Sequence, residues 1–349
     1  MRAAPIYTNE MLTAKRLQGD VPADGFIRQA FTSPQAREQL RDWLIATTYN
    51  YQLSNLPEEY SKSDLFNHAS WLPAWANINL IRAGRAFFAM HAEAIMQLLG
   101  LLSLPYCYTA ADGAMVLYLS NRLGNDTAKR LQETAEFVWD VMAPDAFNEE
   151  GKGFVSILKV RLMHAAGRYY TLANPAWRAY YGTPINQEDM AGTNLSFSLI
   201  VIRGLRKLGF AIQQDDQQAF LHLWNVIGYL LGLHDSLLPE TSAHAQDLEA
   251  AIRLRQFRSS EQGRHLTASL TDVFLNGANR GSFDKNELLG LMRYLGDEVS
   301  GHLGIQAPML SASKIRFLTG INLLNDLKPK GNAVTAFYAA HSEFKRTPI

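Results

Sequence analysis

The sequence predicts an all-α fold. Apolar residues recur every three to four positions along most of the chain, which is typical of helices with one buried face. Alternating apolar and polar runs bounded by hairpin turns, which would indicate strands, are almost absent. Hydrophobic residues make up 47% of the 349 residues and charged residues 19%, which fits an ordered globular protein. We expect a single helical domain over residues 1–349, because no long linker interrupts the chain.

The expected helices follow from the period of the apolar residues. They lie near residues 34–49, 72–101, 105–122, 126–143, 151–172, 187–209, 215–233, 242–256, 258–277, 284–303 and 311–326.

Capping and helix-ending residues between these segments agree with the expected helices. Ser33-Pro34 combines an N-cap residue with a first-turn proline. The segment NRLGND (121–126) provides a glycine that ends one helix and a polar cap for the next, and NGANRGS (276–282) predicts a loop between helices. The last stretch, which begins KPKGNAV at residue 328, follows a proline and glycine break, so we expect a docked terminal helix with a frayed end.

Composition excludes several classes of protein. The formal net charge is zero, with 33 basic and 33 acidic residues, so the basic surface of a nucleic-acid binder is not expected. Cys107 is the one cysteine, which rules out an intrachain disulfide and a multi-cysteine zinc site. The N-terminus lacks the apolar run of a signal peptide, and the most apolar windows fall short of the ~20 residues of a membrane span. We therefore expect a cytoplasmic protein.

Common catalytic and metal motifs are missing from the sequence. NGANRGSFDKNE has the central glycine and final glutamate of a calcium loop, but acids are absent at the early ligand positions. The chain has no HExxH motif, no phosphate-binding loop, no GxGxxG and no strand-turn-helix nucleophile elbow. The remaining candidates are the nine histidines, most of which we expect to be ordinary surface or partly buried residues.

His164 differs from the other histidines by its context. It lies in KVRLMHAAGRYY (159–170), a segment with the pattern of a buried helix that Arg161 and Arg168 interrupt. At ~100° per residue, Arg168 follows Arg161 along the helix and His164 lies about 60° to one side, so the three polar groups can converge. On one interpretation, acids of neighbouring helices pair with the arginines and His164 makes an ordinary hydrogen bond. On the other, His164 ligates a metal while the guanidiniums bind carboxylates of its organic frame, as in heme.

The preceding helix carries a second polar pair. In AKRLQETAEFVWDVM, Arg130 and Thr134 stand four residues apart and share a face, which continues with Phe137, Val138 and Val141. This pair can hydrogen-bond an oxygen species or a water network above an iron. Alternatively, a carbonyl satisfies the arginine and the threonine bonds to its own helix.

With both helices in view, the chain resembles the latex clearing proteins, which are heme b rubber oxygenases, and the wider set of proteins sharing their catalytic domain. That set includes an enzyme that oxidatively cleaves a farnesyl chain in mycophenolic acid biosynthesis. The resemblance covers roughly residues 105–240 and implies a globin-like helical core with additional helices around a heme pocket. It rests on RLQETAEFVWDVM, KVRLMHAAGRYY, GTPINQEDMAGTNLSFSLIVIRGLRKLGF and VIGYLLGLHDSLLP.

The resemblance implies roles for the residues of both helices. His164 matches the proximal ligand of the heme iron, and Arg161 and Arg168 match the basic residues that flank it. Arg130 and Thr134 match a polar pair on the other side of the heme pocket, where they are the expected catalytic residues.

A third motif and two departures complete the comparison with this family. Within GTNLSFS, Thr193 and Ser196 are the best matches to a hydroxyl residue of the pocket. Where latex clearing proteins have a lysine able to ligate the iron, this chain has Glu133. The expected position of their catalytic glutamate holds Ala114, and the nearest acid is Asp112, so Glu133 or Asp112 would have to take over that role.

Together these patterns predict a cytoplasmic, heme b-dependent oxygenase. Its partners are dioxygen and an apolar, unsaturated or isoprenoid small molecule, whose carbon–carbon double bond is cleaved oxidatively. The alternative is a non-catalytic heme or apolar-ligand binding protein, such as a sensor or carrier, for which the missing acid at Ala114 is the best support. A helical scaffold without a cofactor is the third possibility.

Overall fold

The computed structural model describes residues 6–67, 69–120, 127–276, 284–326 and 331–346. Within these ranges every named element is a helix, and the one β-bridge joins Ala110 to Phe257. The predicted all-α class is therefore confirmed. The main helices are α1 (Asn9–Arg16), α2 (Val21–Ala30), α3 (Pro34–Ala46), α4 (Glu58–Ser61), α5 (Ile78–Leu98), α6 (Leu104–Thr109), α7 (Ala111–Leu119), α8 (Thr127–Met142), α9 (Gly153–Leu172), α10 (Gln187–Phe197), α11 (Leu199–Lys207), α12 (Gln214–Leu230), α13 (Ser242–Gln256), α14 (Glu261–Asn276), α15 (Lys285–Leu295), α16 (Asp297–His302), α17 (Ala312–Asp326) and α18 (Ala333–Arg346).

Three predicted helices are broken in the structure. The segment 105–122 divides at Ala110, which leaves the helix to form the bridge with Phe257. The segment 187–209 divides at Ser198, where φ is −112° and ψ is −82°, and the segment 284–303 divides at Gly296. Apolar periodicity continues across each break, so the pattern alone does not reveal it.

The N-terminal part of the chain differs from the sequence prediction, whereas the C-terminal part agrees with it. Two short helices, α1 and α2, were not predicted; Thr8 and Asp20 cap them by accepting hydrogen bonds from backbone N–H groups. The predicted terminal helix is confirmed as α18. The NRLGND segment, all but the first residue of NGANRGS, and residues 327–330 lie outside the described residues.

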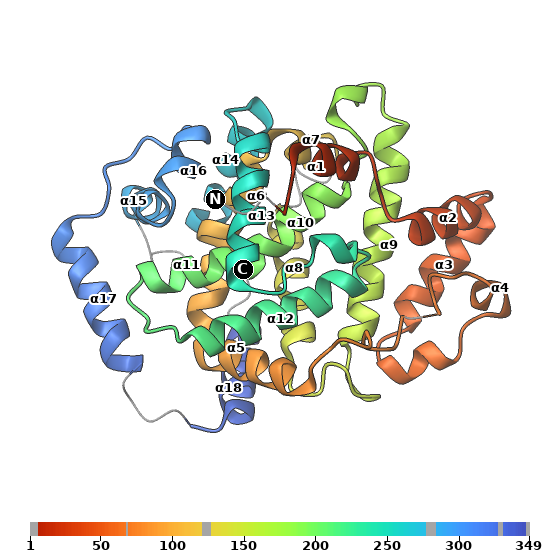
Figure 1. The fold of residues 1–349 in the computed structure, drawn as a ribbon, viewed down its shortest axis with the longest axis horizontal. Coiled ribbons are helices and arrows are strands. Elements are labelled where there is room, and N and C mark those ends of the chain that lie inside the picture. The colour runs from red at the N-terminus through yellow and green to blue at the C-terminus, as the bar shows by residue number, and fades with distance from the viewer. Residues whose placement is uncertain (1–5, 68, 121–126, 277–283, 327–330, 347–349) are drawn as a thin grey trace.

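The core is built around α5. Figure 1 shows α12 and α18 along α5, with α9 standing between this core and the outer helices α2 and α3. The α5–α12 pair has the most extensive contact among the described helices. A glycine permits this approach, because a Cβ at Gly84 would lie 2.7 Å from the carbonyl oxygen of Ala219.

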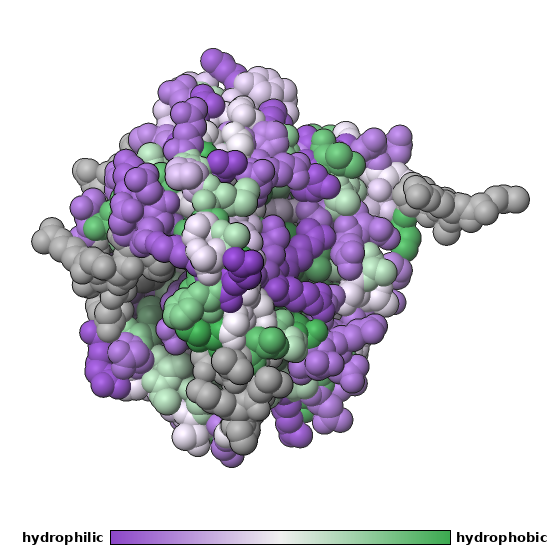
Figure 2. Space-filling view, turned by 90° about the vertical axis from the view of Figure 1, so that its left-hand side faces the viewer, coloured by the Kyte–Doolittle hydropathy of each residue, from purple (hydrophilic) through white to green (hydrophobic). Residues whose placement is uncertain are grey.

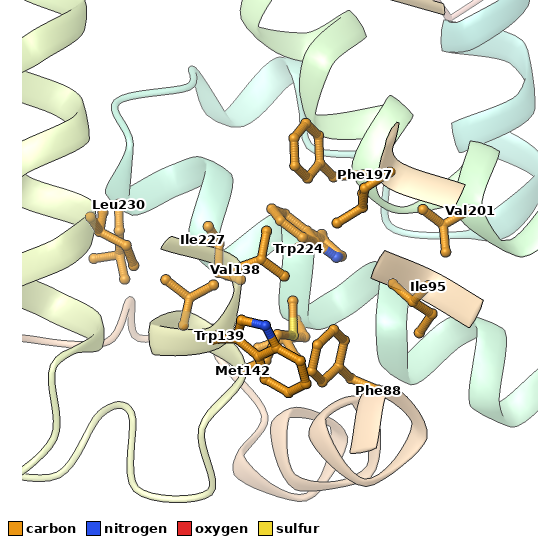
Figure 3. Packing of buried hydrophobic residues seen from close by; sticks show 14 of the residues in the cluster. Phe88, Ile95, Val138, Trp139, Met142, Phe197, Val201, Trp224, Ile227 and Leu230 are labelled. Carbon is orange, nitrogen blue, oxygen red and sulfur yellow. The ribbon is translucent and has the colours of Figure 1, made fainter. Parts of the chain in front are cut away.

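Aromatic side chains fill the middle of the core, as Figure 3 shows. Phe88 meets Trp139 edge-on with ring centroids 5.3 Å apart, and Phe197 meets Trp224 at 5.2 Å. Offset and edge-on contacts of this kind stabilise aromatic pairs beyond their burial. These rings bring helices α5, α8, α10 and α12 together around one apolar centre.

The run from Ile78 to Thr109 is longer than the sequence windows suggested. α5, a π-helical turn at Leu99–Ser103 and α6 follow each other without a gap, and the run is long and apolar enough to cross a membrane. However, 67% of its most apolar window is buried inside the protein, and a core helix passes the same test of length and composition. Packing against α12 and α18 accounts for its apolar character.

The outer helix α17 has the opposite pattern to a core helix. Its Asn322 donates a hydrogen bond to the carbonyl oxygen of Leu208 at 2.9 Å. Phe317, Leu318 and Ile321 are exposed. Figure 2 views the molecule from the side on which α17 lies, and hydrophobic groups there are interspersed with hydrophilic ones. This helix adds little to the core.

Docking of α18 depends on Phe337, which is 1% exposed and packs against Phe88 and Trp139. We expect Phe337→Ala to lower the free energy of unfolding by about 3–4 kcal/mol, because it leaves a cavity among aromatic rings. Tyr338→Ala, at the exposed neighbouring position, is the matched control and should change it by under about 0.5 kcal/mol. Urea unfolding of both variants checks this, and equal effects would show that α18 is not held by its apolar face.

Candidate functional site

Helix α9 carries the candidate site, and its largest contact is with α2. The Arg161 guanidinium binds Asp20, the N-cap residue of α2, through two hydrogen bonds. Nε donates to Oδ2 at 2.5 Å, and Nη2 donates to Oδ1 at 2.9 Å. Its Nη1 reaches the carbonyl oxygen of Leu230 at the end of α12. Gly232, with φ of +89°, lies two residues after Leu230, and a Cβ there would overlap the Asp20 carboxylate. Two-pronged pairing of this kind fixes the orientation as well as the charge.

Arg168, two turns further along α9, is 2% exposed and is also paired with α2. Its Nε donates to Asp24 Oδ1 at 2.6 Å, and its Nη1 donates to the carbonyl oxygen of Ile185 at 3.1 Å. Its Nη2 is buried without a hydrogen-bond partner among the described residues. Both arginines thus pair with acids of a neighbouring helix, as the first interpretation expected. Their role toward the carboxylates of a cofactor remains a prediction, with Nη2 of Arg168 as the donor that remains unused.

His164 lies on α9 between these two ion pairs. Its Nδ1 is buried without a partner among the described residues, so the hydrogen bond expected by the first interpretation is not found. The ring as a whole is half-buried, which leaves Nε2 as the ring nitrogen with accessible surface. Burial, with a smaller effect of Arg168, lowers the pKa of His164 to about 4, although Asp20 acts in the opposite direction. The imidazole is therefore neutral at pH 7, which is the form that binds metals.

The polar pair on α8, Arg130 and Thr134, partly matches the simpler interpretation, in which the threonine bonds to its own helix. Thr134 Oγ1 donates to the carbonyl oxygen of Arg130 at 2.8 Å, so its hydroxyl proton is used within the helix. Both side chains are half-buried. The positive charge of Arg130 acts on Tyr108 of α6, whose pKa burial raises to about 12 while Arg130 lowers it. Arg130 is therefore close enough to α6, the helix that also carries Cys107, for its charge to act there.

Asp112 and Glu133, the two candidate replacements for a catalytic base, differ in burial. Asp112 of α7 is 7% exposed and forms ion pairs with Arg16, at 3.5 Å, and with Arg258. It is therefore a structural anion. Ala114, at the expected position of the base, is buried, whereas Glu133 is exposed.

Helix α10 contributes a stripe of polar side chains. Asp189, Thr193 and Ser196 lie four and three residues apart and share a face. The Ser196 hydroxyl donates to the carbonyl oxygen of Thr193 at 2.7 Å and lies 3.2 Å from the Cys107 sulfur. Thr193 Oγ1 donates to the carbonyl oxygen of Asp189 at 2.9 Å. The structure therefore brings Ser196 and Thr193 together with Cys107, which the sequence did not single out for this site.

His164, Cys107 and Thr193 each keep some accessible surface. Burial raises the pKa of the Cys107 thiol and lowers that of His164, so both lie deep in the protein. Yet both side chains are only half-buried, and Thr193, whose hydroxyl acts on the same thiol, is exposed on an otherwise buried helix. Two surface hollows of about 590 and 440 Å³ lie elsewhere, on α15–α16 and α12–α13.

The sequence did not predict the buried charge network around Glu188 and Asp189 at the start of α10. Arg16 of α1 contacts Glu188 at 3.3 Å and Asp189 at 2.9 Å, and Glu188 is also bound by Arg255 at 2.7 Å. Burial raises the pKa of Asp189 to about 6, although Arg16 acts against this. The partners are 67 to 173 residues apart in the sequence, so no local pattern links them.

The donor set fits heme better than a metal held by protein ligands alone. No group of three or more His, Cys, Asp or Glu that could hold a metal ion is found in the part of the chain that the structure describes. A heme iron needs from the protein one neutral nitrogen, and its carboxylates need N–H donors. His164 offers the nitrogen, and Nη2 of Arg168 offers a buried donor without a partner.

Comparisons with known proteins agree on one family. Residues 81–319 match the family model of the ER-bound oxygenase mpaB/B′/rubber oxygenase catalytic domain. The rubber oxygenase of Streptomyces sp. (strain K30) is 30% identical over 188 residues, which cover 52% of this chain and 46% of that protein. The match thus spans about half the length of this curated relative.

A solved structure shares the fold. The structure of the latex clearing protein LCP in the closed state superposes with a TM-score of 0.78 at 23% identity, covering 95% of this chain and 90% of that chain. The family model spans more than half of the chain, and its range contains α8, α9 and α10 with the residues described above. The chain therefore belongs to the mpaB/B′ and rubber oxygenase catalytic-domain family.

Proposed function

We propose that this protein is a heme b-dependent oxygenase that cleaves a carbon–carbon double bond of an apolar, unsaturated or isoprenoid small molecule. The observation that carries the proposal is His164, a neutral imidazole with an accessible Nε2, placed between two guanidiniums on one helix. Neutral imidazole is the form required of an axial iron ligand.

The ion pairs on α9 set the position of the proposed ligand. Arg161 and Arg168 attach α9 to α2 at points three residues before and four residues after His164, which restricts movement of the helix there. Nη2 of Arg168 is the group that would hold a carboxylate of the cofactor. Heme, when bound, would supply the chemistry with dioxygen, which protein side chains do not provide.

Arg130 and Thr134 would act on the dioxygen and substrate beside the cofactor. Arg130 provides a positive charge on the α8 side, and Thr134 provides oxygen lone pairs, because its proton is used within the helix. The aromatic core around Trp224 and Phe197 makes the interior apolar and excludes water. The family is one of oxygenases, and the rubber oxygenase relative supports an unsaturated hydrocarbon chain as the substrate class.

A non-catalytic carrier or sensor is the second candidate, and one observation favours it. Ala114 offers no acid, and Asp112 is bound by two arginines, so neither provides a free base at that helix. Anaerobic reduction followed by oxygen and a panel of terpenoid alkenes separates the candidates. An oxygenase releases carbonyl products, whereas a carrier forms an oxygen complex without any cleaved product.

Heme retention tests the proposed ligand. Protein expressed with ample heme is expected to show a Soret absorbance that His164→Ala loses by about tenfold or more, because the axial bond is removed. His244→Ala, on α13, is the matched control and should retain the absorbance. Equal absorbance in the wild type and His164→Ala would remove His164 as the ligand, and colourless wild-type protein would remove heme altogether.

The pH dependence of stability tests the neutrality of His164. Its folded pKa of about 4 lies below the ordinary histidine pKa of 6.5, so the unfolded chain takes up the proton first as the pH falls. Stability due to His164 is thus complete above about pH 6.5 and is lost toward pH 4, by up to ~3 kcal/mol.

Asp189 acts in the opposite direction over part of this range, because its folded pKa is raised to about 6. Comparing wild type with His164→Gln cancels that contribution, since both proteins contain Asp189. In urea unfolding of heme-free protein, the wild type should lose more stability than His164→Gln between about pH 7 and about pH 4.5. Parallel pH curves would contradict a neutral, buried His164.

A further inference from the structure

The two arginines of α9 differ in how their guanidinium nitrogens are used. Every side-chain nitrogen of Arg161 has a hydrogen-bond partner, because Nε and Nη2 donate to the Asp20 carboxylate and Nη1 donates to the carbonyl oxygen of Leu230. Arg168 instead has Nη2 buried without a partner in the part of the chain that the structure describes. Two arginines that look alike in the sequence therefore differ in their capacity to bind a ligand.

Two groups from different segments fix the guanidinium of Arg168. Asp24 of α2 accepts a hydrogen bond from Nε at 2.6 Å, and the carbonyl oxygen of Ile185 accepts one from Nη1 at 3.1 Å. In the described ranges, Ile185 is the one residue other than glycine with a positive φ, which is +48°. This conformation is costly for a β-branched side chain, and strain of this kind is concentrated at functional sites. The backbone is thus strained where its carbonyl group holds Arg168.

Close packing leaves the pair of Asp24 and Arg168 little freedom to move. A Cβ at Gly19 would lie 2.7 Å from Oδ2 of Asp24 and 3.1 Å from Cδ of Arg168, so both side chains lie directly against the backbone there. Gly19 is itself held, because its carbonyl oxygen accepts a hydrogen bond from Nε2 of Gln187 at 2.9 Å. The orientation of the guanidinium is therefore set before a ligand binds, which lowers the entropic cost of binding.

The unused Nη2 of Arg168 determines the kind of ligand group that it can hold. A guanidinium only donates hydrogen bonds and keeps its charge at pH 7, so its best partner is an anion with oxygen lone pairs. His164 lies four residues earlier on α9, and residues at this spacing are neighbours on a helix surface. A carboxylate on the organic frame of an iron bound to His164 is therefore an acceptor of the right charge.

We propose that the two arginines have separate roles in the cofactor site. Arg168 receives one carboxylate of the cofactor through Nη2, and Asp24 is the positioning residue that holds its guanidinium for this task. Arg161 is a structural clamp between α9 and α2 and receives no ligand. This inference rests on the proposed function, because it divides the cofactor site of that function between its residues. It narrows the expectation from the sequence, in which both arginines flank the cofactor.

Heme and its dimethyl ester, which lacks the charges of both carboxylates, test this division of roles. Each is titrated into the heme-free protein at pH 7, and binding is followed by Soret absorbance, so the readout does not depend on activity. We expect the wild type to bind heme at least about tenfold more tightly than the ester, the advantage of one charge-assisted hydrogen bond. The second carboxylate contributes to every variant alike, so changes in this preference isolate the contribution of Arg168.

Substitution of each arginine locates the receptor. Arg168→Gln removes Nη2, so we expect it to lower the preference for heme over the ester about tenfold. Arg161→Gln is the matched control, because it removes the other ion pair between α9 and α2. It should weaken binding of both probes alike and leave the preference within about twofold of the wild type.

Two substitutions of Asp24 separate positioning from net charge. Asp24→Ala leaves Nε of Arg168 without support, so the preference should fall as it does in Arg168→Gln. Asp24→Asn keeps an oxygen that accepts from Nε and removes the negative charge that competes with the cofactor, so it should retain or increase the preference. A merely structural role of Asp24 would instead weaken binding of heme and the ester alike in both variants.

The outcomes separate this inference from the proposed function. Absence of binding by either probe would overturn both. Equal affinity of the wild type for heme and the ester would overturn the inference while the heme proposal stands. A preference that Arg168→Gln leaves unchanged, or that Arg161→Gln abolishes, would overturn the separate roles of the arginines. Full preference in Asp24→Ala would remove Asp24 as the positioning residue.

Discussion

The pairing of α9 with α2 is the constraint on which the site depends. Two guanidiniums on α9 bind two carboxylates on α2, and His164 lies between them on the same helix. Burying a charge is costly unless it is paired, so Asp20 and Asp24 are what allow these two arginines inside the fold. The same pairing surrounds an imidazole that has no hydrogen bond of its own among the described residues. A polar group kept deep and unpaired is a feature that stability alone does not explain.

The interior of the molecule combines a large apolar core with a few polar groups in defined states. Trp139, Trp224 and their neighbours exclude water, while His164 is held neutral and Asp189 is close to its protonation point at neutral pH. Both shifts have the same main cause, which is burial, yet they act in opposite directions because one group is a base and the other an acid. Polar groups in such states are more typical of functional sites than of packing.

Sequence patterns predicted the class of fold and the helix that bears His164, because a long helix with a buried face leaves a strong period in the sequence. They did not predict where helices break. Ser198 leaves the helix although apolar residues continue past it, so the apolar period does not mark the break. The polar pair on α8 and the hydroxyl residues of α10 were identified through motifs. Their partners were not, because Cys107 approaches Ser196 from 89 residues away and Arg16 approaches Asp189 from 173.

Gly232 gives the ion pair on α9 an unexpected dependence on the end of α12. The residue turns the chain in a left-handed conformation directly against the Asp20 carboxylate, and any side chain there would displace it from Arg161. Asp20 also begins α2, so a single hydrogen atom in place of a methyl group keeps three helices in register. A family member with a larger residue at this point would need a different anchor for its histidine helix.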